Sequence, residues 1–61
     1  MAELFPFTAQ EKAAAVRREV AMRERVYPGL VANHKMSAER AERGIAIMRA
    51  IAEDYEREAG R

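Results

Sequence analysis

The chain has 61 residues, of which 49% are hydrophobic and 34% are charged, and its formal net charge is +1 at pH 7. This length fits one domain at most, and so short a chain buries only about 60% of the surface that its unfolded form exposes. The sequence has no cysteine and a single histidine, His34, which excludes disulfides, thiolate metal sites and multi-histidine sites. The balanced charge creates no strong field toward nucleic acid or a membrane surface. Stability must therefore come from helix packing or from association with another chain.

The N-terminal residues 1–7 are interpreted as an apolar arm, in which Leu4, Phe5 and Phe7 surround Pro6. The arm has no basic region and no long hydrophobic stretch, unlike a signal peptide. No apolar run in the chain approaches the length of a membrane span, so we expect a cytoplasmic protein with no membrane partner. The arm either folds back over the open end of the helices or inserts into a groove of a partner. We favour the first interpretation because a small core can use every aromatic ring.

A first helix is predicted over residues 9–32, within a helical hairpin that occupies residues 8–61. Thr8 and Glu11 match the capping-box pattern of a helix start, and residues 9–26 contain neither glycine nor proline. Apolar residues at spacings of three, four and seven form one stripe, and a second, weaker stripe lies on another side. The first stripe contains Ala9, Ala13, Val16, Val20 and Tyr27, and the second contains Ala15, Met22 and Val26.

Pro28 disturbs the end of this first helix. A proline removes one helical hydrogen bond and biases the residue before it, Tyr27, away from the helical conformation. The apolar pattern nevertheless resumes over residues 30–32. We therefore expect either a kink at Pro28 or a separate short turn, followed by a break near Asn33 and His34 and a turn over 33–36. Asn33 is the residue expected to take the left-handed conformation that ends helices.

A second helix is predicted over residues 38–59. Ser37 is a good N-cap, and Gly60 is a stop signal. Seven residues align on one face, and Ile47 widens that face. The seven are Ala41, Gly44, Ile45, Met48, Ile51, Ala52 and Tyr55.

The predicted fold is all-α, an antiparallel two-helix hairpin, because the connection between the helices is so short. In a lone hairpin each helix has a single neighbour, so part of each broad apolar face stays exposed, and exposed apolar patches usually mark an interface. We expect two hairpins to pair into a four-helix bundle, or one hairpin to dock on a larger partner. The residues predicted to form the core and this interface are Val16, Val20, Met22, Val26, Tyr27, Ala41, Gly44, Ile45, Ile47, Met48, Ile51, Ala52 and Tyr55.

The sequence contains no recognisable catalytic constellation. Thr8 and Ser37 are explained as helix caps, and His34 lies in a polar turn. Glu39 and Glu42 could share a helix face, but carboxylate-bridged metal sites in helical bundles also need a histidine three residues from a glutamate, and none is present. We therefore predict that the protein is not an enzyme and needs no cofactor and no metal.

Arginines of the first helix offer a nucleic-acid surface as the alternative. Arg17, Arg18 and Arg25 are the candidate phosphate contacts. They spread around the helix, acidic residues are interleaved with them, and no aromatic residue stands among them to stack on bases. A solvated, ion-paired surface is the preferred interpretation. A structural subunit of a larger assembly is a further alternative.

Two segments, VRREVAMRERVYPGLV and KMSAERAERGIAIMRAIAEDY, carry a resemblance that spans residues 16–55. The chain resembles a group of small bacterial and prophage-encoded proteins with a VYP-x-LV segment followed by an IAIM helix. Relatives often have glycine in the turn, where this chain has Asn33 and His34. The resemblance implies a helical hairpin in a phage or mobile-element context and supplies no activity. Together these observations predict a non-catalytic protein-interaction module that self-associates, as a homodimer, and acts as an accessory or regulatory protein.

Overall fold

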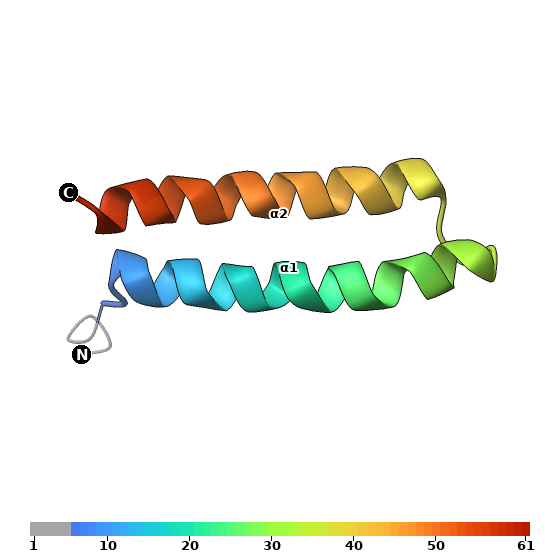
Figure 1. Cartoon of the computed structure of the whole chain (residues 1–61), viewed down its shortest axis with the longest axis horizontal. Helices are drawn as coiled ribbons and strands as arrows, with labels where there is room; N and C mark the ends of the chain where they lie inside the picture. The colour runs from blue at the N-terminus through green and yellow to red at the C-terminus, as the bar shows by residue number, and fades with distance from the viewer. Residues whose placement is uncertain (1–5) are drawn as a thin grey trace.

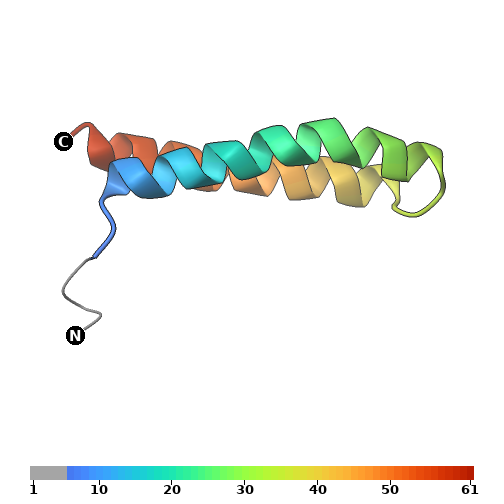
Figure 2. The same cartoon turned by 90° about the horizontal axis from the view of Figure 1, so that it is seen from below.

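The computed structural model describes residues 6–61, which form two α-helices joined by a short turn (Figure 1). Helix α1 spans Ala9–Ala32 and helix α2 spans Ala38–Ala59, and these bounds match the predicted ranges. The helices lie side by side and antiparallel, so the start of α1 and the end of α2 are at one end of the hairpin and the turn is at the other. This confirms the all-helical hairpin. Within residues 6–61 no third helix covers either side of the pair, as the second view shows (Figure 2).

Side chains close to the start of each helix satisfy its first backbone N–H groups. The Glu11 amide donates to Thr8 Oγ1 at 3.0 Å, and the Thr8 amide donates to a Glu11 carboxylate oxygen at 2.8 Å, which completes the capping box. The hydrogen bond from the Thr8 backbone holds the pKa of Glu11 below its ordinary value. At the start of α2, Ser37 Oγ accepts from the Arg40 amide at 3.1 Å. Local sequence therefore determines where both helices begin.

Helix α1 continues through Pro28 without interruption. The predicted bias of Tyr27 away from the helical conformation is wrong, and so is the alternative of a separate short turn. Proline leaves one helical carbonyl without its donor, and here Glu24 and Pro28 are both exposed, where water can replace that hydrogen bond. Tyr27 and Leu30 are meanwhile partly buried on either side of the proline. Packing of these residues outweighs the local preference of the proline.

The turn that ends α1 places its left-handed residue at His34, with φ of 59°, and not at Asn33, whose φ is −93°. The Lys35 amide donates to the Leu30 carbonyl at 2.8 Å, and the His34 amide donates to the Val31 carbonyl at 3.0 Å. This pair of hydrogen bonds is the Schellman motif, in which the left-handed position follows the C-cap residue. The sequence pattern predicted the left-handed conformation one residue too early, at Asn33. His34 therefore occupies a position at which glycine is the usual residue.

Replacing His34 with glycine should stabilise the protein. A left-handed conformation costs a residue with a Cβ about 1–2 kcal/mol, and glycine avoids this penalty. After the larger conformational entropy of glycine in the unfolded chain is subtracted, we expect His34→Gly to raise the free energy of unfolding by about 1 kcal/mol. Urea unfolding followed by circular dichroism measures this. His34→Ala is the matched control, because it removes the imidazole and keeps the penalty; equal stability of the two variants would contradict the interpretation.

The core between the helices is small. Ala13 and Val20 of α1 and Ala41 and Ala52 of α2 are the buried residues of the described part, and no large side chain is fully buried there. Alanines allow a close approach of the helices but bury little apolar area each.

Candidate interaction surface

Ion pairs between the helices occupy one side of the hairpin. The Arg17 guanidinium makes two hydrogen bonds to the Glu56 carboxylate, at 2.7 and 2.8 Å. Arg49 of α2 pairs with Glu24 of α1 farther along the same side. All four side chains are well exposed, so each pair stabilises the hairpin only modestly. Their main consequence is that this side of the hairpin is polar and carries ion pairs that join its two helices. We refer to it as the ion-paired side.

These contacts predict a loss of stability in acid. The Arg17 guanidinium lowers the pKa of Glu56 below its ordinary value of 4.5. A carboxyl whose pKa is lower in the folded state contributes stability above its unfolded pKa and loses it as the pH falls through the folded pKa. Thermal unfolding should therefore shift to lower temperature as the pH decreases below about 5. Glu56→Gln should flatten this dependence, and an equally steep acid response in that variant would refute the assignment; Glu42→Gln, an exposed carboxyl elsewhere on α2, is the control.

Large apolar side chains are exposed on the other side of the hairpin. They are Met22 and Val26 of α1 and Ile47 and Ile51 of α2, and Ile47 is 55% exposed. Consecutive helical residues are rotated by about 100°. Ile51 therefore lies about a quarter of a turn from the buried residues of its helix, Ile47 and Val26 about a third of a turn, and Met22 nearly half a turn. Because the helices are antiparallel, the two rotations turn toward the same side. The four residues therefore form one exposed apolar surface, which we call the apolar side.

A shallow hollow of about 300 Å³ lies on the apolar side near the turn and is lined by both helices. Arg23 is held at its floor, because its guanidinium donates to Glu19 at 2.7 Å and to the Gly44 carbonyl at 3.0 Å. The same guanidinium lies 5.7 Å from the centre of the Tyr27 ring, within cation–π distance. The lining residues are Arg23, Tyr27, Met36, Arg40, Arg43, Gly44 and Ile47. Both helices therefore contribute to one surface at this hollow.

Gly44 lies where the two helices contact each other. A Cβ at this position would lie 3.4 Å from Tyr27 Cε2 and 3.5 Å from Arg23 Nη1. Both are ordinary van der Waals distances, so packing within the hairpin accommodates alanine as well as glycine. The contact with α1 thus does not require a glycine at this position.

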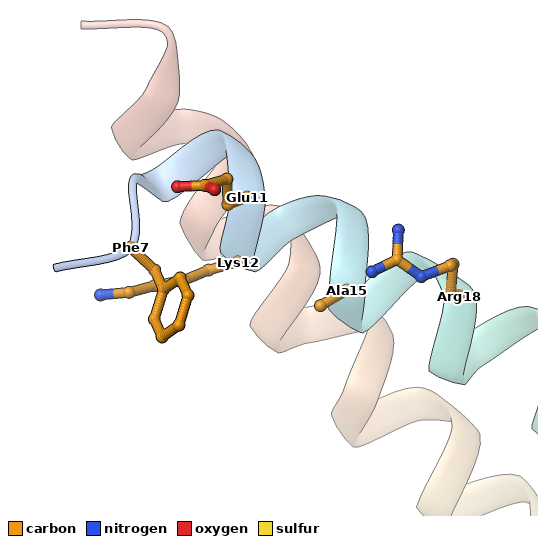
Figure 3. Close-up of a pocket in the computed structure, with 5 residues that line it drawn as sticks. All are labelled: Phe7, Glu11, Lys12, Ala15 and Arg18. Atoms are coloured by element: carbon orange, nitrogen blue, oxygen red, sulfur yellow. The ribbon is translucent and has the colours of Figure 1, made fainter. Parts of the chain in front are cut away.

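A second hollow, of about 400 Å³, lies beside the start of α1 (Figure 3). Phe7 stands at its edge and is 71% exposed, so this ring does not cover the open end of the hairpin. Leu4 and Phe5, the other apolar residues of the predicted arm, lie outside the described residues. Lys12 lies 5.4 Å from the centre of the Tyr55 ring and so connects this end of α1 to α2. The lining residues are Phe7, Glu11, Lys12, Ala15 and Arg18.

The residues predicted to form the core and the interface fall into three groups. Val20, Ala41 and Ala52 are buried between the helices. Another group is partly buried along the same contact, and a last group is exposed on the apolar side. The partly buried residues are Val16, Tyr27, Gly44, Ile45, Met48 and Tyr55, and the exposed residues are Met22, Val26, Ile47 and Ile51. Sequence reasoning did not identify Arg23 as a link between the helices, because nothing in its spacing indicates a hydrogen bond to Gly44.

The structure does not gather the three arginines proposed as phosphate contacts. Arg17 turns toward α2 and is bonded to Glu56. Arg18 and Arg25, seven residues apart, share the outer side of α1, and both are exposed. Arg18 also lines the hollow beside Phe7. Arg17 therefore lies on a different side of the hairpin from Arg18 and Arg25.

Among residues 6–61 no three acidic or histidine side chains are grouped closely enough to hold a metal ion. Neither described helix combines the length and the apolar character that crossing a membrane requires. No protein-family model, no curated protein and no solved structure matches the chain. Its function therefore has to be argued from the two unlike sides of the hairpin.

Proposed function

We propose that this protein is a non-catalytic protein-interaction module that self-associates through its apolar side. One observation carries the proposal: four large apolar side chains are exposed on one side of a hairpin whose buried residues, within the described part, are three alanines and one valine. Exposed apolar patches of this kind mark interaction surfaces. The ion-paired side, by contrast, carries two ion pairs that join the helices within the chain. The apolar side is therefore the binding surface.

A second copy of the chain can cover this surface. It presents the same four exposed apolar side chains, so a two-fold pairing covers the apolar sides of both copies at once. Pairing two hairpins side to side gives a four-helix bundle, the common way for antiparallel helix pairs to bury an apolar face. The proposed assembly is a homodimer.

The biological setting belongs to the proposal as well. The resemblance to small prophage-encoded proteins supports an accessory or regulatory role in a phage or mobile element. In that setting the dimer would present its polar, ion-paired sides outward, and any further partner would bind there or at the hollow beside Phe7.

Light scattering coupled to gel filtration, over a wide range of protein concentration, tests the proposal. A constant mass of two chains that decreases only at high dilution is the expected result. A helical monomer at every concentration would overturn self-association and would leave the apolar side for a different protein. Circular dichroism of the same samples shows whether helicity falls together with mass. It should do so if the core of a single hairpin is too small to keep that hairpin folded.

A further inference from the structure

One surface stripe of α2 carries a heptad pattern in which only Gly44 also takes part in the contact with α1. Its residues alternate at spacings of four and three, the repeat by which helices form the seam of a coiled coil. Five of the six are exposed, and only Gly44 is partly buried. The six are Arg40, Gly44, Ile47, Ile51, Asp54 and Glu58. We call this stripe the α2 seam.

The chemistry of the α2 seam changes along the helix. Its turn end is basic at Arg40, with Arg43 beside it, and its middle is apolar at Ile47 and Ile51. Its far end carries Asp54, which pairs with Arg57 of the same helix, and the acidic Glu58. If two copies paired in the parallel direction, Arg40 would face Arg40 and the acidic ends would face each other, and like charges at close range repel. The two copies can instead pair in the antiparallel direction, with Arg49 of one copy level with Arg49 of the other. Ile47 then faces Ile51 of the second copy. The same alignment brings Arg40 to Glu58 of the second copy.

The second stripe of α1 agrees with this alignment. Ala15, Met22 and Val26, with the charged Glu19 between the first two, repeat with the same spacings, and the midpoint of these four lies between Glu19 and Met22. Within the hairpin Arg17 is bonded to Glu56 and Arg23 to Gly44. Arg49 itself pairs with Glu24, so position 49 of α2 is level with the part of α1 between residues 17 and 24. A single two-fold axis can then pass close to the centres of both stripes.

We infer that two copies seat their apolar sides on each other with α2 antiparallel to α2 of the second copy and α1 antiparallel to α1. In this bundle every helix is antiparallel to both of its neighbours. Ile47 packs on Ile51 at the centre, and Arg40 pairs with Glu58 at each end. The inference rests on the proposed self-association and adds its partner, direction and register. In the other symmetric arrangement, whose two-fold axis runs along the hairpin, α2 would instead face α1 of the second copy.

Engineered cysteines distinguish the two arrangements, because the natural chain has no cysteine. Arg40→Cys and Glu58→Cys chains, tagged to differ in mass, are mixed, dissociated, reassociated and oxidised. The antiparallel seam places the two introduced thiols opposite each other, within the distance of a disulfide. Two chains that both carry Arg40→Cys would instead hold their thiols about 27 Å apart along the axis. The expected product is the mixed disulfide, at least about ten times more abundant than either symmetric one.

The control pair is Ala46→Cys with Glu53→Cys. The midpoint between these two residues along α2 is nearly the same as the midpoint between Arg40 and Glu58. Both residues are exposed and lie on the far side of α2 from the seam, so they should not cross-link. If the parent protein is a dimer but the Arg40→Cys and Glu58→Cys chains give no excess of the mixed product, the antiparallel seam is overturned and self-association still stands. A parent protein that is a monomer in light scattering would overturn both proposals. The two failures are therefore distinguishable.

Discussion

Ile47→Glu is expected to convert the dimer into single chains. In the hairpin the Ile47 side chain is 55% exposed, so the substitution disturbs the helix contact little, but in the dimer it places two carboxylates at the centre of an apolar interface. Each isoleucine lost from burial costs about 1.5–3 kcal/mol, and desolvating the charge adds to this. We expect the dissociation constant to rise at least about 100-fold. Light scattering at matched concentrations measures the change in mass.

The control for this substitution is Ala46→Glu. Ala46 is exposed on the far side of α2, so the variant carries the same added charge without entering the proposed interface. It should keep the mass of the parent protein. Equal masses for the Ile47→Glu variant and the parent at every concentration would show that the apolar side is not the site of self-association.

Ala52→Asp is expected to unfold the protein. Ala52 is 0% exposed, the most completely buried of the described residues, and it lies in the contact between the two helices. Burying a charge there, together with the steric overlap of a larger side chain, costs more than about 3 kcal/mol. A short chain with a small core has little more stability than this to lose. Far-ultraviolet circular dichroism at room temperature measures the loss of helicity.

Ala50→Asp is the matched control, because Ala50 belongs to the same helix and is exposed. Both variants lose the same helix propensity and gain the same charge, so any difference between them reports burial. The control should retain its helical signal. If the Ala52 variant remained as helical as the Ala50 variant, the contact between α1 and α2 would not be the one described here.

The two substitutions address different levels of the structure. Ala52→Asp acts on the contact within one hairpin, and its effect should persist at every protein concentration. Ile47→Glu acts between hairpins, so raising the concentration should partly restore its mass and its helicity. The concentration dependence therefore separates the fold from its self-association.

Much of the fold follows from local features that a linear sequence displays directly. Thr8 with Glu11, and Ser37, determine where the helices begin, because capping groups act on amides only two or three residues away. The apolar periodicity identifies the inward faces, including Val20 and Ala52. With only a short connection, two such helices have to pack antiparallel. Helix bounds and hairpin were therefore predictable without a structure.

Other features depend on which residues meet across the hairpin, and local sequence does not contain that information. Helix α1 passes through Pro28 because packing on both sides of the proline outweighs its local cost. Arg17 and Arg23 become links between helices only because Glu56 and Gly44 lie opposite them. The left-handed turn residue is His34 because the hydrogen bonds of the helix end select that position.

The division of the apolar residues is the most informative case. Periodicity alone assigns Met22, Val26, Ile47 and Ile51 to apolar stripes, because it shows which residues share a side of a helix. Only the packed hairpin shows that α1 and α2 leave all four of these side chains exposed on the same side. Each helix can turn only one strip toward its single neighbour, and the mutual rotation of the helices decides which strip that is. The close packing of the buried residues Ala13, Val20, Ala41 and Ala52 selects this rotation.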